Sequence, residues 1–377
     1  MNVPLVDLKA SLTPIREALR KEFEAILDGM QLFLGPNVQA FEKDFTAFCE
    51  VKHGLGVSNG TDALILALKA LGIGAGDEVI VPAHTFFASI EAIVHAGATP
   101  VMVDIEPGTM TIDPKKIGPM LSPKTRAIMP VHLYGHPADM DPILAIAREH
   151  KLKVIEDCAQ AHGARYKGRR CGSMGDAAGF SFYFTKNLGA FGEAGFVTTP
   201  HDDLAELMKQ YRHHGHVSKF EHAHVGYNFR LDELQAAVLR LKLRLLEANN
   251  GRRVAIARQY DERLAKTGLK LLKPRGDSEP VYHLYPIQTE HRDGLIEYLN
   301  GRGIGTGIHY KIPGHLQPAL KTHSHRFGDM SVTEQTCRGL LSIPMYPELT
   351  DEQVDYVADH VCEFLRERAP TSRVGAR

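Results

Sequence analysis

The chain has 377 residues, 44% of them hydrophobic, and its 44 lysines and arginines nearly balance its 45 aspartates and glutamates. A chain of this length can bury a large core and a smaller second unit, so we expect a globular protein with two domains. Because the charges are balanced, we expect neither nucleic acid nor an anionic membrane as a partner.

Cysteine usage and hydropathy favour a reducing, cytoplasmic setting. The five cysteines are scattered without a CxxC pair, which argues against a disulfide framework and a structural zinc site. The N-terminal residues lack the apolar core and cleavage site of a signal peptide, and no later segment is apolar for long enough to cross a bilayer. Histidines gather in one stretch, at His213, His214, His216, His222 and His224. Their spacing matches no standard ligand set, so we expect no metal site.

The first two thirds of the chain alternate between helical and strand patterns. Apolar residues recur at helical spacing over 13–30 and 38–48. Seven short apolar runs follow as candidate strands, at 53–57, 78–81, 100–103, 126–131, 153–155, 178–182 and 195–198. Helices fit between most of them, as at 61–71, 88–96 and 139–150. Strands buried on both faces and joined by helices predict an α/β fold with a mainly parallel, doubly wound sheet.

The remaining chain predicts a second, smaller unit. A helix at 202–213 leads into a polar loop at 213–227, and a helix at 231–247 carries an apolar stripe that suits core packing or a partner helix. The composition shifts at 273–277, and a small α+β unit follows, with strands at 281–288 and 305–309 and helices at 292–302 and 351–368. We therefore expect a large domain over 1–250 and a small domain over 251–377, with a frayed tail at 369–377.

One lysine stands where a strand should leave the core. The run Gly-Phe-Ser-Phe-Tyr-Phe-Thr-Lys-Asn-Leu-Gly at 179–189 reads as a short apolar strand followed by a turn that carries Lys186. Burial lowers the pKa of a lysine and makes its neutral amine available to attack a carbonyl. Most lysines are solvated surface charges, so Lys186 needs support from its surroundings.

Three further strand ends carry groups that suit one ligand. Gly60 and Thr61 lie at a helix N-terminus, where free N–H groups and the helix dipole can hold a phosphate; a plain Asn or Thr helix cap is the alternative. Asp157 ends a run that should be buried and has no cation nearby in sequence, so a ligand's protonated ring nitrogen would suit it. Phe86 offers a face on which a planar ring could stack.

These groups can converge, because ligands of open α/β sheets collect outside the carboxyl ends of the strands. Together they describe a site for pyridoxal 5'-phosphate. Lys186 would bond to the cofactor's aldehyde carbon, Asp157 would keep its pyridine nitrogen protonated, and Phe86 would pack on its ring.

Five ordered motifs also run through the chain. They are Ser-Asn-Gly-Thr-Asp-Ala-Leu at 58–64, Glu-Asp-Cys-Ala-Gln-Ala at 156–161, the run at 181–189, Gly-Tyr-Asn-Phe-Arg-Leu at 226–231 and Leu-Ser-Ile-Pro-Met-Tyr-Pro at 341–347. With these motifs the chain, from about residue 3 to residue 365, closely resembles the DegT/DnrJ/EryC1/StrS sugar aminotransferases. The resemblance implies a fold-type-I, aspartate-aminotransferase-like enzyme, in which a large domain binds pyridoxal phosphate and a small α+β domain follows it. It also implies a homodimer with active sites at the subunit interface.

Further residue roles come from this resemblance alone. Ser181 would hold the cofactor's phosphate together with the Gly60-Thr61 turn, and Gln160 would lie near its phenolic oxygen. Asn228 would reach the phosphate of the cofactor in the neighbouring subunit, with Arg230 as a further candidate for that contact.

Two positions depart from the family's usual pattern. Phe184 and Lys311 stand where proline is common, which bears on loop shape and substrate contacts. Lys186 is kept, and because relatives with histidine there act as dehydratases, the resemblance favours transamination.

The reaction that the resemblance implies moves an amino group from an amino acid, by family likeness glutamate, to a nucleotide-linked ketosugar for amino sugar and polysaccharide biosynthesis. His309 and Tyr310, with His-Leu-Gln at 315–317, resemble members that act at C3. A 3-keto sugar is therefore favoured, with His309 and Tyr310 as candidate substrate contacts. A 4-keto sugar and an 8-keto octulosonate are alternatives within the class. A non-catalytic regulatory protein on the same scaffold is the alternative from another class, and the intact Lys186, Asp157 and Ser181 argue against it.

Overall fold

A computed structural model describes residues 1–368, and the tail at 369–377, which we expected to be frayed, lies outside the described residues. An eight-stranded sheet forms the centre of the molecule, in the order β1-β9-β8-β5-β4-β2-β3-β15. Its strands are β1 (His53–Val57), β2 (Glu78–Pro82), β3 (Thr99–Val103), β4 (Thr125–Ile128), β5 (Lys153–Asp157), β8 (Ala177–Ser181), β9 (Gly195–Thr199) and β15 (Arg326–Phe327). Only β9 runs against its neighbours β1 and β8, and all other neighbours pair in parallel. The predicted mainly parallel sheet is confirmed.

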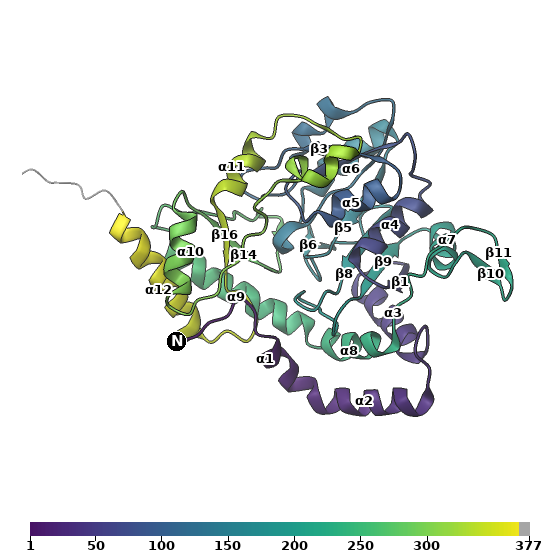
Figure 1. Ribbon diagram of the computed structural model, residues 1–377, viewed down its shortest axis with the longest axis horizontal. Helices are drawn as coiled ribbons and strands as arrows, with labels where there is room; N and C mark the ends of the chain where they lie inside the picture. Colours follow the sequence, from purple (N-terminus) through teal and green to yellow (C-terminus); the bar gives the residue numbers. More distant parts are fainter. Residues whose placement is uncertain (369–377) are drawn as a thin grey trace, which may run out of the picture.

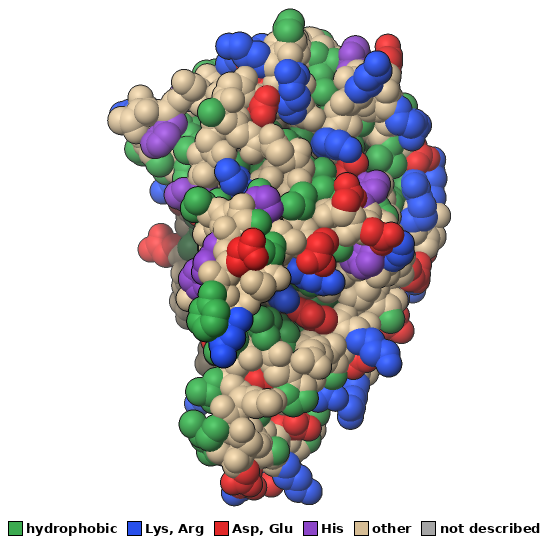
Figure 2. Space-filling view, turned by 90° about the vertical axis from the view of Figure 1, so that its right-hand side faces the viewer, with side chains coloured by type: hydrophobic (Ala, Val, Ile, Leu, Met, Phe, Trp, Pro, Cys, Tyr) green, Lys and Arg blue, Asp and Glu red, His purple; other side chains and the backbone are tan. Residues whose placement is uncertain are grey.

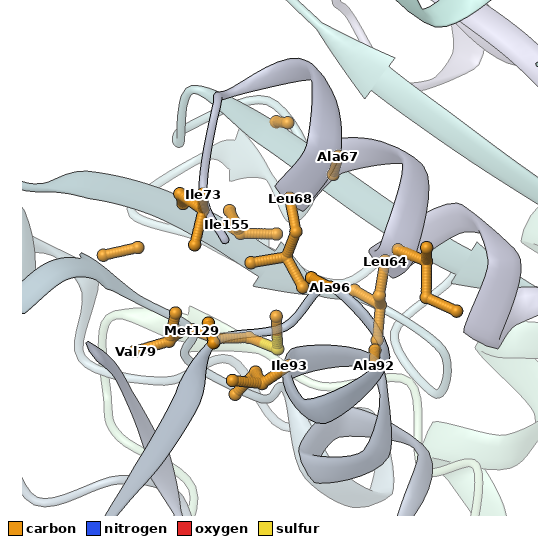
Figure 3. Packing of buried hydrophobic residues seen from close by; sticks show 14 of the residues in the cluster. Leu64, Ala67, Leu68, Ile73, Val79, Ala92, Ile93, Ala96, Met129 and Ile155 are labelled. Carbon is orange, nitrogen blue, oxygen red and sulfur yellow. The ribbon is translucent and has the colours of Figure 1, made fainter. Parts of the chain in front are cut away.

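Helices cover both faces of this sheet (Figure 1). In chain order the helices are α1 (Leu8–Leu12), α2 (Arg16–Gly29), α3 (Pro36–Phe48), α4 (Gly60–Ala70), α5 (Ala88–His95), α6 (Met140–His150), α7 (Asp202–Arg212), α8 (Glu233–Leu243), α9 (Leu246–Leu264), α10 (Arg292–Asn300), α11 (Ser331–Gly339) and α12 (Asp351–Arg368). Alternation along β2 shows how the layers form, since Val79 and Val81 pack with α4 and α5 while Ile80 packs with α6 on the other face. Figure 3 shows the first of these cores, where strand and helix side chains interlock, among them Leu64, Leu68, Val79, Ile93 and Ile155.

An aromatic cluster anchors β8, the strand that leads toward Lys186. The ring of Phe45, on α3, lies 5.2 Å from Phe180, 5.1 Å from Phe182 and 4.9 Å from Phe196, measured between centroids and with edge-to-face geometry. All four rings are fully buried. The turn after β8 therefore starts from a rigid base.

The C-terminal part builds a second core on a smaller antiparallel sheet. Strands β12 (Lys270–Leu271), β14 (Tyr285–Gln288) and β16 (Leu340–Ile343) form this sheet, and α9, α10 and α12 pack around it. Val3 joins the same core from the N-terminus, because its N–H and carbonyl oxygen bond to Gly303 and Gly305. A third small sheet consists of β13 (Ser278–Glu279), β6 (Arg165–Tyr166) and β7 (Arg169–Arg170), and its Tyr166 packs in the core between the large sheet and α6.

Some predicted elements differ from the structure. The strand expected at 281–288 begins only at Tyr285, and the segment 305–309 is not a strand. The reason is that this segment divides its backbone hydrogen bonds, with Gly305 bonding to Val3 and Gly307 to Ser342 of β16. The helix expected at 231–247 is interrupted between α8 and α9, and the loop at 213–227 carries a short hairpin of β10 (His216–Ser218) and β11 (Glu221–His222).

The division into 1–250 and 251–377 stays a prediction. Its boundary falls within α9. The second core is built largely from residues beyond it, but β15 pairs with β3 of the large sheet, and Leu320 and Met330 pack in the core of α4 and α5. In the described part of the chain, no helix combines the length and the apolar character needed to cross a membrane.

Candidate active site

A cavity of about 1030 Å³ opens at the carboxyl ends of β5 and β8. Nine residues singled out from the sequence line it: Gly60, Thr61, Phe86, Asp157, Gln160, Ser181, Lys186, His309 and Tyr310. They come from strand ends and loops that are far apart in the chain, as expected for a site at the edge of a parallel sheet.

Lys186 lies in the turn after β8, where its backbone N–H donates to the carbonyl of Tyr183 at 2.8 Å. Desolvation lowers the pKa of its amine to about 8, against the opposing attraction of Asp157 and Glu193. A lysine with this pKa can give and take a proton near neutral pH.

The start of α4 meets the end of β8 at a point where only glycine fits. A Cβ added to Gly60 would lie 2.6 Å from Cβ and 3.0 Å from Cα of Ser181. Asn59 caps the helix, since its side-chain oxygen accepts the N–H of Asp62 at 2.8 Å. Asn59 is therefore a helix cap, and Gly60 brings the first turn of α4 against Ser181. A phosphate site at this point stays a prediction, and the two interpretations are compatible.

Asp157 is buried and its carboxylate is fixed by neutral donors. Ser89 Oγ donates to Oδ2 at 2.6 Å, and the N–H of Ala159 donates to Oδ1 at 3.0 Å. Ser89 lies on α5, 68 residues away in sequence, and no local pattern indicated it. The carboxylate keeps a defined orientation toward the cavity, which suits a cationic ring nitrogen.

Gln160 and Tyr310 meet from distant parts of the chain. Gln160 accepts the N–H of Tyr134 at 2.6 Å and donates its own amide N–H to the hydroxyl of Tyr310 at 3.1 Å. The Tyr310 ring lies 5.6 Å from the ring of Phe86, between centroids, and the two form one wall of the cavity. His309 pairs through Nδ1 with Ser342 Oγ at 3.0 Å, and burial lowers its pKa to about 4, so its ring is neutral near pH 7.

A buried carboxylate beside the site could suggest a metal, but its oxygens are already used. His132, Glu156 and Cys158 bring possible ligand atoms within 4.8 Å of one another. Glu156 accepts hydrogen bonds from the N–H groups of Gly172, Met174 and Gly175 and pairs with His132 Nε2 at 3.0 Å. Burial opposes its ionisation, but these donors lower the pKa of Glu156, so it is a buried anion that anchors the 172–175 turn.

The structure does not bring every predicted residue into the cavity. Asn228 is exposed and does not line it, while its neighbours Tyr227 and Phe229 do. Arg230 stacks on the ring of Phe33, 4.4 Å from the ring centroid.

The cavity wall also contains residues that sequence patterns did not indicate. They are Leu5 and Val6 from the N-terminus, Glu193 beside Lys186, His283, and Met345. Met345 belongs to the motif at 341–347, which could have pointed to it.

Residues 14–362 match the DegT/DnrJ/EryC1/StrS aminotransferase family. The chain belongs to this family. The dTDP-3-amino-3,4,6-trideoxy-alpha-D-glucose transaminase of Streptomyces venezuelae is 46% identical over 363 residues, which cover 96% of each chain. The UDP-N-acetyl-3-dehydro-alpha-D-glucosamine 3-aminotransferase of Acidithiobacillus ferrooxidans is 42% identical over 358 residues, or 94% of this chain and 96% of the relative.

A solved structure supports the same fold. DesV of S. venezuelae, crystallised in complex with a ketimine intermediate, matches with a TM-score of 0.94 and 46% identity over 97% of this chain and 98% of that chain. The predicted fold-type-I architecture is confirmed. The protein is a sugar aminotransferase of this family, and its cofactor is pyridoxal 5'-phosphate.

The residues in the cavity fit this cofactor. The close approach of Gly60 to Ser181 leaves the first turn of α4 open to a phosphate, Asp157 is fixed for a ring nitrogen, and Lys186 presents an amine of lowered pKa. Lys186, Asp157 and Ser181 lie at or just beyond the ends of only two neighbouring strands, β5 and β8.

Proposed function

We propose that the protein transfers an amino group from glutamate to a nucleotide-linked 3-keto sugar, in a ping-pong reaction. The observation that carries the proposal is a lysine amine of pKa about 8 in one cavity with a fixed buried aspartate and a glycine-lined helix N-terminus. Few other chemistries need these three groups together.

Each group has a defined task in this reaction. Gly60, Thr61 and Ser181 would hold the phosphate, and Asp157, oriented by Ser89, would keep a proton on the ring nitrogen. The bound cofactor supplies an electron sink for the carbon that loses its proton. Lys186 Nζ would anchor the cofactor, and its amine, when free, would take the proton from the donor's α-carbon.

Relatives support the 3-keto sugar. The two relatives at 46% and 42% identity are named for 3-amino and 3-dehydro sugars, linked to dTDP and UDP respectively. In the wall of the cavity, the neutral ring of His309 and the hydroxyl of Tyr310 can exchange hydrogen bonds with sugar hydroxyls. With a 4-keto sugar or an 8-keto octulosonate, the same residues would have to position a different carbon of the sugar for amination.

The charge of the cavity supports a homodimer with shared sites. Among the residues that line it, Lys186 is the sole lysine or arginine, and four acidic residues line the same cavity, Asp62, Glu91, Asp157 and Glu193. A nucleotide-linked sugar and a dicarboxylic donor both bring negative charge, so cations from a second chain would complement this cavity. Asn228 is exposed in its own chain, and we propose that it serves the site of a second copy.

The surface beside this region has mixed charge. Figure 2 shows lysines, arginines, acids and several histidines interspersed over the face that carries α7 and the β10–β11 hairpin. A nucleic-acid partner would need a basic stripe, and this face offers both signs instead.

The first test is a visible absorption spectrum of the purified protein before and after addition of glutamate. We expect a yellow band from lysine-bound cofactor that disappears when glutamate is added. Lys186→Ala should lack the band and lose turnover by about 10³-fold or more while remaining folded. A protein that stays colourless with added pyridoxal phosphate would contradict the proposal. A yellow band that persists after glutamate is added would exclude glutamate as the donor.

The second test compares 3-keto and 4-keto nucleotide sugars as acceptors. We expect the 3-keto sugar to be aminated, and mass spectrometry of the product detects the amination. Amination of the 4-keto sugar alone would overturn the choice of carbon and leave the reaction class intact.

A further inference from the structure

Tyr134 is a fully buried residue just behind the cavity wall, and it does not line the cavity itself. Its backbone is left-handed, with φ of 59° and ψ of 9°, a conformation that residues other than glycine seldom adopt. Gly135 follows with φ of 86°, and a Cβ there would lie 2.9 Å from Val281 Cγ2 and 3.0 Å from the backbone nitrogen of His283. A turn this tight is maintained only where its surroundings hold it in place.

Every polar group of Tyr134 is bonded to a different segment of the cavity wall. Its N–H donates to Gln160 Oε1 at 2.6 Å, and its carbonyl accepts the N–H of His283 at 2.8 Å. Its hydroxyl donates to the carbonyl oxygen of His309. Gln160, His283 and His309 all line the cavity. One buried residue thus joins three segments of the wall, and Gln160 is more than a hundred residues of sequence away from both His283 and His309.

The hydroxyl of Tyr134 belongs to a chain of hydrogen bonds in which each group donates its proton to the next one. His84 Nε2 lies 2.6 Å from this hydroxyl, and Cys337 Sγ lies 3.6 Å from His84 Nδ1. Burial lowers the pKa of His84 to about 4 and raises the pKa of Cys337 to about 12 and that of Tyr134 well above its ordinary value, so all three are neutral near pH 7. Because Tyr134 gives its single proton to His309, His84 must donate to Tyr134, and Cys337 must donate to His84.

The hydrogen-bond chain ends at His309, and a second hydrogen bond, from the His309 ring, also holds this residue. Ser342 Oγ lies 3.0 Å from Nδ1 of the His309 ring, and the backbone of Ser342 pairs with Gly307 in both directions. Nδ1 is therefore occupied, and Nε2 is the ring nitrogen left for a ligand. The orientation of Nε2 then depends on both supports, the Ser342 hydroxyl on the ring and the Tyr134 hydroxyl on the main chain.

We propose that Tyr134 is a positioning residue for the acceptor half of the reaction, because it fixes the His309 carbonyl and through it the ring that meets the sugar. The inference rests on the proposed function. Tyr134 touches neither substrate nor cofactor. Its hydroxyl donates only to the 307–310 segment, and the hydrogen bond that it accepts comes from His84, which does not line the cavity. Its backbone groups support Gln160 and His283, so loss of the hydroxyl alone should affect the sugar and spare the donor.

Tyr134→Phe tests this, measured on the holoenzyme in two single-turnover half-reactions. The donor half is followed as loss of the yellow band with glutamate, and the acceptor half as its return with the 3-keto nucleotide sugar. We expect the donor rate to stay within about twofold of wild type, and the half-saturating sugar concentration to rise about five- to tenfold, the effect of one lost buried hydrogen bond.

Tyr260→Phe is the matched control. Tyr260 is also fully buried and donates its hydroxyl to a backbone carbonyl, that of Pro344 at 3.0 Å, but Pro344, unlike His309, does not line the cavity. This variant should leave both half-reactions unchanged. If Tyr134→Phe behaves like Tyr260→Phe, or slows both halves equally, the inference is overturned.

A crystal structure of the Tyr134→Phe holoenzyme gives a test that does not depend on the sugar. We expect the main chain at 307–310 and the ring of His309 to be displaced, and an unchanged segment would overturn the inference. If wild-type enzyme loses its band with glutamate but no ketosugar restores it, the proposed acceptor is wrong, and this structure alone decides the role of Tyr134.

Discussion

At the scale of single residues, burial sets the chemistry of the site. Desolvation brings the pKa of Lys186 to about 8, against about 10.4 for a solvated lysine. Only the neutral amine attacks an aldehyde. We therefore expect the rate at which the apoprotein forms its yellow band with pyridoxal phosphate to rise about tenfold per pH unit below pH 8 and to level off above it. Stopped-flow absorbance across this range checks the prediction. A rate that keeps rising beyond pH 10 would show an ordinary lysine, and Lys186→Ala supplies the baseline.

At the scale of elements, we expect binding of the cofactor's phosphate to depend on how closely α4 approaches β8. The Cβ of an alanine at position 60 would lie 2.6 Å from Ser181 Cβ. Gly60→Ala should therefore push the helix away, lower the free energy of unfolding by about 1–3 kcal/mol and weaken cofactor binding about tenfold or more. Gly251→Ala, in α9 with no atom within 4 Å of the added Cβ, is the control. It should stabilise the protein by about 0.5–1 kcal/mol and leave cofactor affinity unchanged. Thermal unfolding and cofactor titration measure both effects, and equal behaviour of the two variants would contradict the role of Gly60.

At the scale of the whole molecule, the shared site can be tested by mixing inactive variants. If Asn228 serves the partner's cofactor, then Lys186→Ala and Asn228→Ala each inactivate their own homodimers. A heterodimer of the two has one site with both residues intact. Random exchange of equal amounts should restore about a quarter of wild-type activity. If Asn228 acts within its own chain, no intact site forms, and the mixture should stay inactive.

The sequence predicted the sheet because its signals are local. Apolar runs such as 78–81 alternate with amphipathic helices, and this pattern alone favours a parallel sheet. The segment at 305–309, Gly-Thr-Gly-Ile-His, misled it, because local sequence says nothing about which partner receives each backbone hydrogen bond. In the fold, Gly305 bonds to the N-terminus and Gly307 to β16, so no strand forms.

The sequence by itself pointed to the residues that we propose carry the chemistry, since Lys186, Asp157 and Gly60 each stand at a strand end or helix start that local patterns reveal. Tertiary structure alone decided how these residues are held. Ser89 reaches Asp157 from 68 residues away, and Tyr134 joins Gln160 to His309 across 149 residues. The physical reason is that strand and helix signals depend on near neighbours along the chain. A buried hydrogen bond depends on distances of about 3 Å that exist only after the elements have packed.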